Sequence, residues 1–281
     1  MIHAVELQDR DFHRLTDLVY RKCGIHLNDN KRELLRARLG KRLRSRGLRS
    51  FNEYYRLLTE EDDGEELTRM LDSISTNLTR FFREEKHFEF LRREVLPAVA
   101  GSPRAGERLK LRVWSAGCSS GEEPYSLAMW ILETWGRESK PDLRILATDI
   151  STKVLAGAVQ GVYHQSRVHS VPGDFQRRYF QKGCGNWQGY LRVKADLRRI
   201  IEFRRLNLME PFSFPEPFDF IFCRNVMIYF DRAMQERLIN RFHGCLREGG
   251  YLFVGHSESL MSLSHPYRYV CPAVYQRAEN S

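Results

Sequence analysis

Apolar side chains recur every three or four positions between residues 8 and 75, which is the period of one face of an α-helix. Four successive stripes carry this period: Phe12–Val19, Leu35–Leu43, Phe51–Leu58 and Leu67–Ile74. No alternating stretch typical of a strand interrupts them. The pattern therefore predicts an all-helical N-terminal domain over residues 1–75. Residues 76–106 are predicted to be a linker with one connecting helix, Phe88–Val99, and a loop with proline and glycine.

A different pattern begins after residue 107. Leu111–Trp114 is an apolar run typical of a buried strand, Ser115–Gly121 is a loop of small residues, and helical spacing resumes from Pro124. Proline suits the first position of a helix because its missing N–H has no partner there. A strand, a glycine loop and a helix in succession open a nucleotide-binding α/β domain. Residues 107–281 are therefore predicted to form a second domain around this stretch.

The alternation of strands and helices continues towards the C-terminus with one interruption. Apolar runs at 144–148, 218–223 and 251–254 predict further strands, and 267–271 with 273–276 predict a terminal hairpin. Between residues 179 and 203 three short strands are predicted around a glycine-rich turn: Tyr179–Gln181, Gly189–Val193 and Ile200–Phe203. These short strands lie outside the regular alternation.

The glycine loop restricts the class of ligand. A dinucleotide site requires G-x-G-x-x-G and a helix N-terminus that accepts pyrophosphate, but here Gly117-Cys-Ser-Ser-Gly121 is followed at once by Glu122 and Glu123. No lysine follows Gly121, so a phosphate-binding P-loop is excluded as well. Glycines let the backbone approach a ligand closely, and two carboxylates suit a cationic ligand such as S-adenosylmethionine, which carries no phosphate. The alternative is that both glutamates only favour a helix N-terminus, and the loop alone leaves the two interpretations equal.

Asp149 ends the second predicted strand of this domain, Arg144–Thr148. An acidic side chain at this place accepts hydrogen bonds from the ribose hydroxyls of a nucleotide. The alternative is a helix N-cap, because Asp149 or Ser151 begins the next predicted helix. Both roles can hold at once.

The net charge of +9 is concentrated in one predicted helix. Residues 31–49 hold nine basic residues and one acidic residue, a local charge of +8, and the acidic segment Glu60–Glu66 follows. Such a one-signed run favours a docking surface for an acidic partner, with Arg38, Arg42 and Arg46 as its expected contacts. Nucleic acid is the second candidate partner, and a merely solvated face is the plain alternative.

Cysteine use and the absence of apolar segments indicate the compartment. The six cysteines are scattered without a C-x-x-C pair, which is typical of reduced thiols rather than disulfides or zinc ligands. The N-terminus MIHAVELQDRDF lacks the apolar core of a signal peptide, and no apolar run approaches the ~18 residues of a membrane span. A cytoplasmic protein with no membrane insertion and no metal is therefore expected.

Five segments, in this order and at this spacing, resemble the CheR family of chemotaxis receptor methyltransferases: TNLTRFFRE, VWSAGCSSGEEPYSLA, ATDI, FCRNVMIYF and GHSE. The resemblance extends from about Asp11 to Gln276, and the combination of CRNVMIYF with the GEEPYS loop is its most specific part. The spacing of Gly117 and Gly121 departs from the common glycine motif of class I methyltransferases, and this departure is itself characteristic of the family.

The resemblance implies an α/β fold: a class I methyltransferase domain with a Rossmann-like, seven-stranded mixed sheet, its antiparallel strand supplied by the terminal hairpin, preceded by the all-helical domain. It also implies a small antiparallel β-subdomain inserted at about 179–203. The implied reaction transfers a methyl group from S-adenosylmethionine to glutamate side chains on chemoreceptor helices, giving methyl esters and S-adenosylhomocysteine. The matching motifs imply cofactor contacts at Asn77, Thr79, Arg83, Glu123, Asp149, Asn207, Leu208, Arg224 and Asn225.

This chemistry requires alignment rather than proton transfer. A glutamate is ionised at neutral pH, so no general base is needed, but it must lie in line with the S–CH₃ bond at about 3–3.5 Å in a site without water. Arg83 is expected to orient the attacking carboxylate, and Tyr229 to donate a hydrogen bond near the methyl donor, with simple packing as the alternative for Tyr229. His256 and Glu258 lack a third metal ligand at a suitable spacing, so a structural hydrogen bond at the strand end is expected there.

Two other classes of protein stay open from the sequence. A nucleic-acid methyltransferase would suit the basic helix, but the D/N-P-P-aromatic motif of enzymes that methylate base amino groups is replaced by Arg224-Asn225-Val226-Met227. A non-catalytic S-adenosylmethionine-binding adaptor is the other class, and the complete set of family positions argues against it.

The insertion is the second candidate for a partner surface. An unpaired strand edge can bind an extended peptide, and in some CheR-like enzymes this subdomain captures a short peptide at the receptor's C-terminus. Four basic residues are expected to meet a carboxylate there: Arg192, Lys194, Arg198 and Arg199. The alternative is that the insertion only covers the core.

Overall fold

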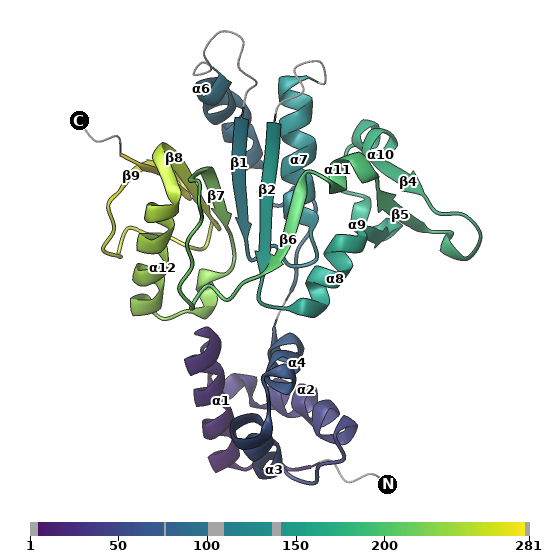
Figure 1. Cartoon of the computed structure of the whole chain (residues 1–281), viewed down its shortest axis with the longest axis vertical. Coiled ribbons are helices and arrows are strands. Elements are labelled where there is room, and N and C mark those ends of the chain that lie inside the picture. Colours follow the sequence, from purple (N-terminus) through teal and green to yellow (C-terminus); the bar gives the residue numbers. More distant parts are fainter. Residues whose placement is uncertain (1–4, 76, 101–109, 137–141, 279–281) are drawn as a thin grey trace.

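The structure, a computed structural model, describes residues 5–75, 77–100, 110–136 and 142–278. Residues 5–75 form a separate helical bundle at one end of the molecule (Figure 1). Its helices are α1 (Asp9–Cys23), α2 (Arg32–Ser45), α3 (Phe51–Arg56) and α4 (Glu65–Ile74), with a 3-10 turn at Asp29–Lys31 and a π-helical turn, Leu57–Glu61, that extends α3. The predicted all-helical domain is confirmed, and the four stripes lie on these four helices in turn.

The helices bury their apolar stripes against one another in a core of their own. Leu15, Leu35, Leu39 and Met70 are completely buried in it, and burial of each such side chain contributes roughly 1.5–3 kcal/mol. The end of α1 also touches the second domain. A Cβ on Gly24 would lie 2.8 Å from two methionine sulfurs of that domain, so only glycine fits there.

A short connecting region leads from the bundle to the second domain. It consists of α5 (Glu85–Phe90), a π-helical turn (Leu91–Val95) and α6 (Leu96–Ala100), which together cover the predicted helix Phe88–Val99. The predicted loop at 101–106 lies outside the described residues.

The second domain is built on a seven-stranded sheet in the order β6-β2-β1-β7-β8-β10-β9. These strands are β1 (Lys110–Ala116), β2 (Asp142–Asp149), β6 (Ile201–Arg205), β7 (Phe218–Cys223), β8 (Leu246–Val254), β9 (Tyr267–Cys271) and β10 (Val274–Arg277). β6, β2, β1, β7 and β8 pair in parallel, whereas β10 is antiparallel to both β8 and β9. The predicted mixed sheet with an antiparallel strand from the terminal hairpin is confirmed.

Helices cover both faces of this sheet (Figure 1). Because successive strand residues point to opposite faces, Val113 of β1 packs in a core with α5, α6 and α7 (Glu122–Trp135), and Trp114 packs in a core with α12 (Arg232–Cys245). α7 begins two residues earlier than predicted. Pro124 is its third residue, which still lies in the first turn, where N–H groups have no intrahelical partner.

The boundaries predicted for the inserted β-subdomain are partly wrong. The small antiparallel sheet exists, but its order is β3-β5-β4, with β3 (Val162–His164), β4 (Phe180–Lys182) and β5 (Tyr190–Val193). The predicted strand Ile200–Phe203 is instead β6 of the main sheet, paired with β2. β3 has only three residues and precedes two short helices, α9 (Gln165–Val168) and α10 (Gly173–Tyr179), so the sequence carried no strand pattern there.

The remaining elements are short. α8 (Thr152–Gln160) follows β2, and α11 (Ala195–Arg198) precedes β6. Two 3-10 turns lie at Gly185–Trp187 and Met227–Tyr229. Among the described residues, no helix combines the length and the apolar character needed to cross a bilayer.

Candidate active site

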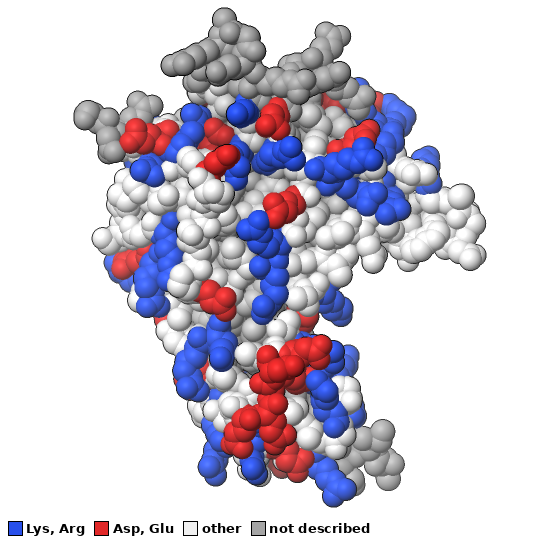
Figure 2. Space-filling view, viewed as in Figure 1, with Lys and Arg blue, Asp and Glu red and all other residues white. Residues whose placement is uncertain are grey.

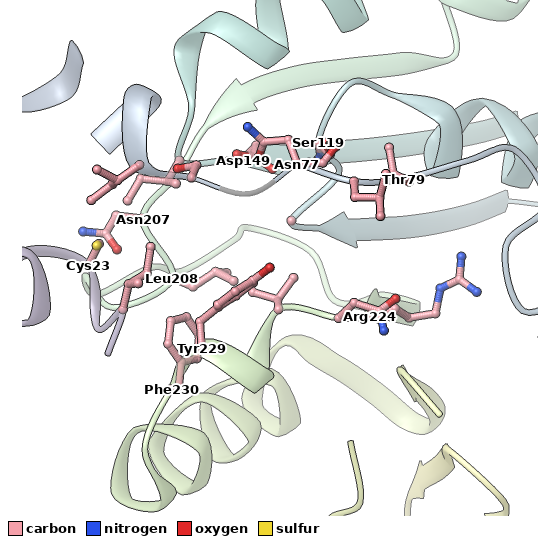
Figure 3. Close-up of a pocket in the computed structure, with 18 of the residues that line it drawn as sticks. Cys23, Asn77, Thr79, Ser119, Asp149, Asn207, Leu208, Arg224, Tyr229 and Phe230 are labelled. Atoms are coloured by element: carbon pink, nitrogen blue, oxygen red, sulfur yellow. Dashed lines mark hydrogen bonds between the residues drawn. The ribbon is translucent and has the colours of Figure 1, made fainter. Parts of the chain in front are cut away.

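One pocket lies where the helical domain meets the carboxyl ends of β1, β2 and β7, the edge at which open α/β sheets bind ligands. All ten residues predicted for cofactor binding and catalysis line it: Asn77, Thr79, Arg83, Glu123, Asp149, Asn207, Leu208, Arg224, Asn225 and Tyr229. Figure 3 shows Asp149 and Asn77 on one side of the pocket and Tyr229 on the opposite side, with Arg224 towards one end and Cys23 towards the other.

The β1–α7 loop turns at two glycines with positive φ, Gly117 at +83° and Gly121 at +95°. A Cβ on Gly117 would lie 2.3 Å from Cγ2 of Val226, and one on Gly121 would lie 2.9 Å from the hydroxyl of Tyr163. Backbone conformation and packing against other protein segments therefore explain both glycines. Close approach of a ligand, the reason expected from the sequence, is not needed to account for them.

Asp149 is buried at the end of β2 and fixes the loop beside it. One carboxylate oxygen accepts a hydrogen bond from the backbone N–H of Ser119 at 2.8 Å, and the other accepts one from Ser151 at 2.9 Å. Burial raises the pKa of Asp149, although these two bonds oppose the shift. The N-cap of α8 is Ser151, whose hydroxyl accepts from the N–H of Val154. Each Asp149 oxygen keeps a second lone pair for a ligand in the pocket.

Glu122 and Glu123 are both buried, and both are paired. Glu122 contacts Arg167 and accepts from the hydroxyl of Ser120 at 2.8 Å, while burial raises its pKa. Glu123 accepts from Ser115 at 2.7 Å and from Nε of Arg224 at 2.8 Å. An arginine from another segment therefore balances each of the two carboxylates that were expected to suit a cationic ligand. Only Glu123 lines the pocket.

Arg224 joins the end of β7 to the segment that carries Arg83. Its side chain is 2% exposed, and its Nη1 donates to the backbone carbonyl of Arg83 at 2.5 Å. The guanidinium also lies over the rings of Phe88 and Phe222, at 5.7 and 5.2 Å from their centroids. A buried charge held by a carboxylate, a carbonyl and two rings has one available geometry, so Arg224 fixes the position of Arg83.

Glu84, His87 and His256 lie together beside Arg224, with possible ligand atoms within 4.8 Å of one another. Spacing in the sequence showed no third ligand beside His256 and Glu258, and the two possible ligands near His256 come instead from a distant segment, Glu84 and His87. Yet Nη1 of Arg224 lies 3.4 Å from Nδ1 of His87 and 3.6 Å from the carboxylate of Glu84. A metal dication placed there would be repelled by this guanidinium. The cluster is better suited to orienting Arg224 than to holding a metal.

His87 is neutral in this environment. Burial, reinforced by the charges of Arg224 and His256, lowers its pKa to about 3. Its Nδ1 lies 3.4 Å from both Nη1 of Arg224 and the carboxylate of Glu84. His87 and Glu123 thus contact different nitrogens of the Arg224 guanidinium, Nη1 and Nε.

Glu258 makes the structural hydrogen bonds expected at the end of β8. Its carboxylate accepts from the backbone N–H groups of Asn225 and Gly255, each at 2.7 Å, and from that of Ile228 at 3.1 Å. Asn225 has a φ of +60°, a left-handed conformation that asparagine tolerates better than most residues. Glu258 thus holds the loop that carries Asn225 and Tyr229.

The two residues predicted to take part in catalysis reach the pocket from different segments. Arg83 is half-buried, and its Nη1 donates to the carbonyl of Leu78 at 3.1 Å. The ring of Tyr229 extends into the pocket (Figure 3), and its carbonyl accepts from the N–H of His26 at 3.0 Å. Both residues therefore line the same pocket.

The helical domain contributes a wall of the pocket that sequence reasoning missed. The lining residues between the end of α1 and the first turn of α2 are Cys23, Ile25, His26, Leu27, Lys31 and Leu34, and Ile74 and Ser75 join them from the end of α4. The two domains are tied together there, because Nδ2 of Asn207 donates to the carbonyl of Lys22 at 2.7 Å and the hydroxyl of Tyr20 bonds to Asp231. These residues carry no motif, and their apolar members are indistinguishable in sequence from core positions.

The arginines predicted to dock a partner are engaged inside the helical domain. Arg42 donates to the buried carboxylate of Glu66 through Nε at 2.9 Å and Nη2 at 2.6 Å, and Nε of Arg46 donates to it at 2.7 Å. Arg38 donates to the carbonyls of Ile74 and Ser75 at the end of α4. These three side chains therefore connect α2 to α4.

Glu66 is the centre of this cluster. Burial would raise its pKa, but hydrogen bonds from Arg42, Arg46 and Tyr54 outweigh burial and lower it. Of the other acidic residues in this segment, Asp62 is half-buried and four are exposed: Glu60, Glu61, Asp63 and Glu65. Figure 2 shows acidic side chains in a stripe over α4 and α3, with basic side chains on either side of it.

The side chains of the pocket fit S-adenosylmethionine. Asp149 offers carboxylate oxygens suited to ribose hydroxyls, and Ile150 and Leu208 supply apolar surface suited to the adenine ring. The other end of the pocket is lined by the carboxylate of Glu123, the guanidinium of Arg224 and the amide of Asn225. These groups suit the ammonium and the carboxylate of an amino acid moiety. When bound, this molecule supplies a methyl group on a sulfonium.

Comparison with known proteins agrees with this site. The family model described as the S-adenosylmethionine-binding domain of CheR methyltransferase matches residues 77–274, and the one described as its all-alpha domain matches residues 10–75. A chemotaxis protein methyltransferase of Escherichia coli is 40% identical over 276 residues, which cover 98% of this chain and 93% of that protein. One from Borreliella burgdorferi is 38% identical over 276 residues, covering 97% and 96%. Chemotaxis protein methyltransferase 2 of Pseudomonas aeruginosa is 41% identical over 269 residues, covering 95% and 93%.

The two family models together match nearly the whole chain, and the relatives align over nearly its full length, which shows the family. The cofactor follows from the matched S-adenosylmethionine-binding domain, and the residues of the pocket suit it. The chain belongs to the CheR methyltransferase family and is an S-adenosylmethionine-dependent methyltransferase.

Proposed function

We propose that this methyltransferase acts in the cytoplasm on chemoreceptors and converts glutamate side chains on their helices into methyl esters. The observation that carries the proposal is the single pocket lined by all ten predicted residues, which come from five separate stretches of the chain. The names of the relatives, which are chemotaxis protein methyltransferases, support the same choice of substrate.

Cofactor binding is assigned to both walls of the pocket. Asp149 accepts the ribose hydroxyls, and Leu208 packs on the adenine ring. Asn77, Thr79 and Asn225 supply the remaining polar contacts. Glu123 and Arg224 hold the amino acid end together with the Arg83 backbone that Arg224 anchors. Asn207 acts chiefly by positioning, since its amide already bonds to Lys22 and Glu210.

Methyl transfer in this site depends on aligning the receptor carboxylate with the S–CH₃ bond of the cofactor. The receptor glutamate is already an anion at neutral pH, so the site needs no base. Arg83 donates to this carboxylate and aims it, and Tyr229 donates a hydrogen bond beside the methyl donor. The buried surroundings of Arg224 and Glu123 exclude water from the line of attack.

Labelled methyl transfer tests this function. The protein is incubated with methyl-labelled S-adenosylmethionine and either receptor-containing membranes or DNA. We expect label in the receptor that mild base releases as methanol, because an ester hydrolyses and an N-methyl group does not. Label in DNA, or base-stable label in protein, would contradict the proposal. Receptor with its methylatable glutamates changed to alanine is the control.

We propose that the outward face of α2 docks the receptor helices. Arg38, Arg42 and Arg46 anchor this helix to α4, which leaves Lys41 and Arg44 as exposed cations that form no ion pair among the described residues. Exposed cations attract a glutamate-rich helix, and salt weakens this attraction beyond about 8–10 Å.

Charge reversal tests the docking face. Lys41→Glu with Arg44→Glu should raise the KM for receptor several-fold at low salt and leave cofactor affinity unchanged. The matched control is Lys110→Glu with Arg144→Glu, two exposed residues at the amino ends of β1 and β2, opposite the pocket. If the two double variants had the same KM for receptor, the exposed face of α2 would be an ordinary solvated surface and not a docking site.

We propose that the β-subdomain tethers a receptor C-terminal peptide along β4. The N–H of Gly183 donates to Tyr190 of β5, and the carbonyl of Tyr179 accepts from Lys194 just after β5. Because bonding alternates in antiparallel pairs, the N–H of Lys182 faces the outer edge. Trp187 and Tyr190 are exposed beside it, and Arg192 and Lys194 supply charge. The inner face packs on the core through Tyr163 and Val193, so covering the core is a second role of this sheet.

Proline substitution at the outer edge tests the tether. Lys182→Pro removes the outward N–H and should abolish binding of receptor C-terminal peptides in a fluorescence titration, whereas Lys182→Ala should retain it. Val193 is unsuitable for this test, because its N–H bonds to Gly161 inside the subdomain. Equal binding by both Lys182 variants, or no binding by the wild type, would exclude this edge.

A further inference from the structure

Large apolar side chains are exposed at few places in the described part of the chain, and three of them belong to segments at or next to the pocket. Leu78 is 85% exposed, Met261 83% and Ile228 51%. Leu78 lines the pocket itself, and Ile228 lies between the lining residues Val226 and Tyr229. Met261 precedes Ser262, whose carbonyl accepts from Arg232, two residues after the lining residue Phe230. Together, these three residues are called the apolar rim below.

Ile228 and Met261 of the apolar rim lie in the loops after β7 and β8, and Leu78 lies in the linker that follows the helical domain. Cys223 and Val254 are register partners at the carboxyl ends of β7 and β8, so the loops carrying Ile228 and Met261 leave the sheet side by side. The carboxylate of Glu258 bonds to the N–H of Ile228 and fixes this pairing. The linker crosses the β1 loop, where the hydroxyl of Ser119 donates to the carbonyl of Asn77 at 3.0 Å.

The residue that aims the substrate lies in the same place. Nη1 of Arg83 donates to the carbonyl of Leu78 at 3.1 Å, so its guanidinium sits against the rim. A glutamate that reaches Arg83 therefore brings its neighbours over Leu78 and Ile228. On a helix, those neighbours lie three or four positions away, on the same face as the glutamate.

We infer that the apolar rim is a specificity surface for the substrate helix, and that it selects glutamates with apolar side chains one helical turn away. This inference rests on the proposed methylation of receptor glutamates. A helix with charged residues in those places would have to desolvate them against Leu78, Ile228 and Met261, which is unfavourable. Apolar residues there would instead remove exposed surface from water on both partners. The exposed charges of α2 would speed the encounter, and the rim would choose the glutamate.

The test is a double-mutant cycle between enzyme and receptor. The enzyme variant is Ile228→Thr with Met261→Gln; Leu78, which also lines the pocket, is left unchanged. The receptor variant has the apolar residues one turn from the methylated glutamate changed to glutamine. We expect the enzyme variant to raise the KM for receptor about fivefold or more with unchanged cofactor affinity, and the receptor variant to add little further loss, because the two changes remove one shared contact.

The matched control is Val159→Thr, which changes an equally exposed apolar residue (51%) at the end of α8 away from the pocket. A KM for the rim variant equal to that of the control, or fully additive losses in the cycle, would overturn the inference. These outcomes are distinct from failure of the proposed function, in which the wild-type protein itself would place no base-labile label in the receptor.

Discussion

Two buried glutamates of this chain bind arginines in the same way and serve different purposes. Glu66 in the helical domain accepts from Arg42, Arg46 and Tyr54, all of the same domain. Glu123 in the methyltransferase domain accepts from Ser115 and Arg224, and Arg224 continues to the backbone of Arg83. The first cluster ends within its own bundle, whereas the second continues along the wall of the pocket to Arg83, which we propose to orient the substrate.

The difference teaches that a cluster of charged residues in the sequence does not show whether their side chains face solvent or a buried partner. The basic helix α2 has a strong electrostatic pattern, yet Arg42 and Arg46 turn inward to one buried carboxylate. Arg38 turns to the last carbonyls of α4. The paired glutamates after the glycine loop suggested a free anionic surface, yet each meets an arginine from a distant segment. The predictions below separate a cluster that holds the fold from one that holds the site.

The largest effect is expected from Glu66→Ala. The change leaves two arginines and the hydroxyl of Tyr54 without their common partner, and loss of one member of a buried ion pair costs about 3–5 kcal/mol. Urea unfolding should show this loss, and cofactor affinity of the folded protein should be unchanged. Glu65→Ala is the control, because this neighbour is exposed and pairs only with Arg69 at the surface. Equal stability of the two variants would contradict the structural role.

Arg83→Ala and Tyr229→Phe should act on turnover. Both side chains are assigned to alignment, and misplacement of a reactant by about 1 Å lowers a rate about 100-fold. Single-turnover methyl transfer should fall by roughly this factor, while the dissociation constant of the cofactor changes far less. A full single-turnover rate in either variant would remove that residue from the catalytic set.

Asp149→Ala should act on cofactor affinity. Loss of a hydrogen bond to a charged group costs about 1.5–3 kcal/mol, which is roughly a 10- to 150-fold weaker affinity. Calorimetric titration measures it. Ser151→Ala is the companion variant, because it removes the N-cap of α8 without removing the carboxylate. If Ser151→Ala weakened binding as much as Asp149→Ala, the effect would come from the loop and not from a ribose contact.

His87 gives a pH-dependent stability. Burial holds its pKa at about 3, below the value near 6.5 of an unfolded histidine. Between these values the unfolded chain binds more protons, so stability falls as pH falls from 6.5 towards 3. The contribution lost by pH 5 is about 2 kcal/mol. His87→Gln should lose this part of the pH dependence, and a parallel pH profile in both proteins would contradict a buried neutral histidine.

The sequence predicted the parts of the molecule that local patterns determine. The helical stripes, the glycine loop, the strand that ends in Asp149 and the terminal hairpin each depend on residues near one another in the chain. The ten pocket residues were found because they belong to motifs, and the structure brings them to one pocket.

What the sequence missed depends on tertiary neighbours. Glu66 looked like one of several surface acids, and only the packing of α4 on α2 buries it. Ile201–Arg205 follows two short predicted strands, so it was grouped with them, although its partner β2 lies more than fifty residues earlier. The wall formed by Cys23–Leu34 has no motif, because apolar side chains that face a ligand look the same as those that face a core.

The central claim is that this site works by alignment and uses no general base. The most direct measurement is the single-turnover rate of methyl transfer to receptor between pH 6 and 9, at saturating cofactor and constant ionic strength. The account predicts a flat profile, because the receptor glutamate, with a pKa near 4.3, is already ionised throughout this range. A rate that rises with an apparent pKa near 7 would show that a base on the protein takes part, and would contradict the account.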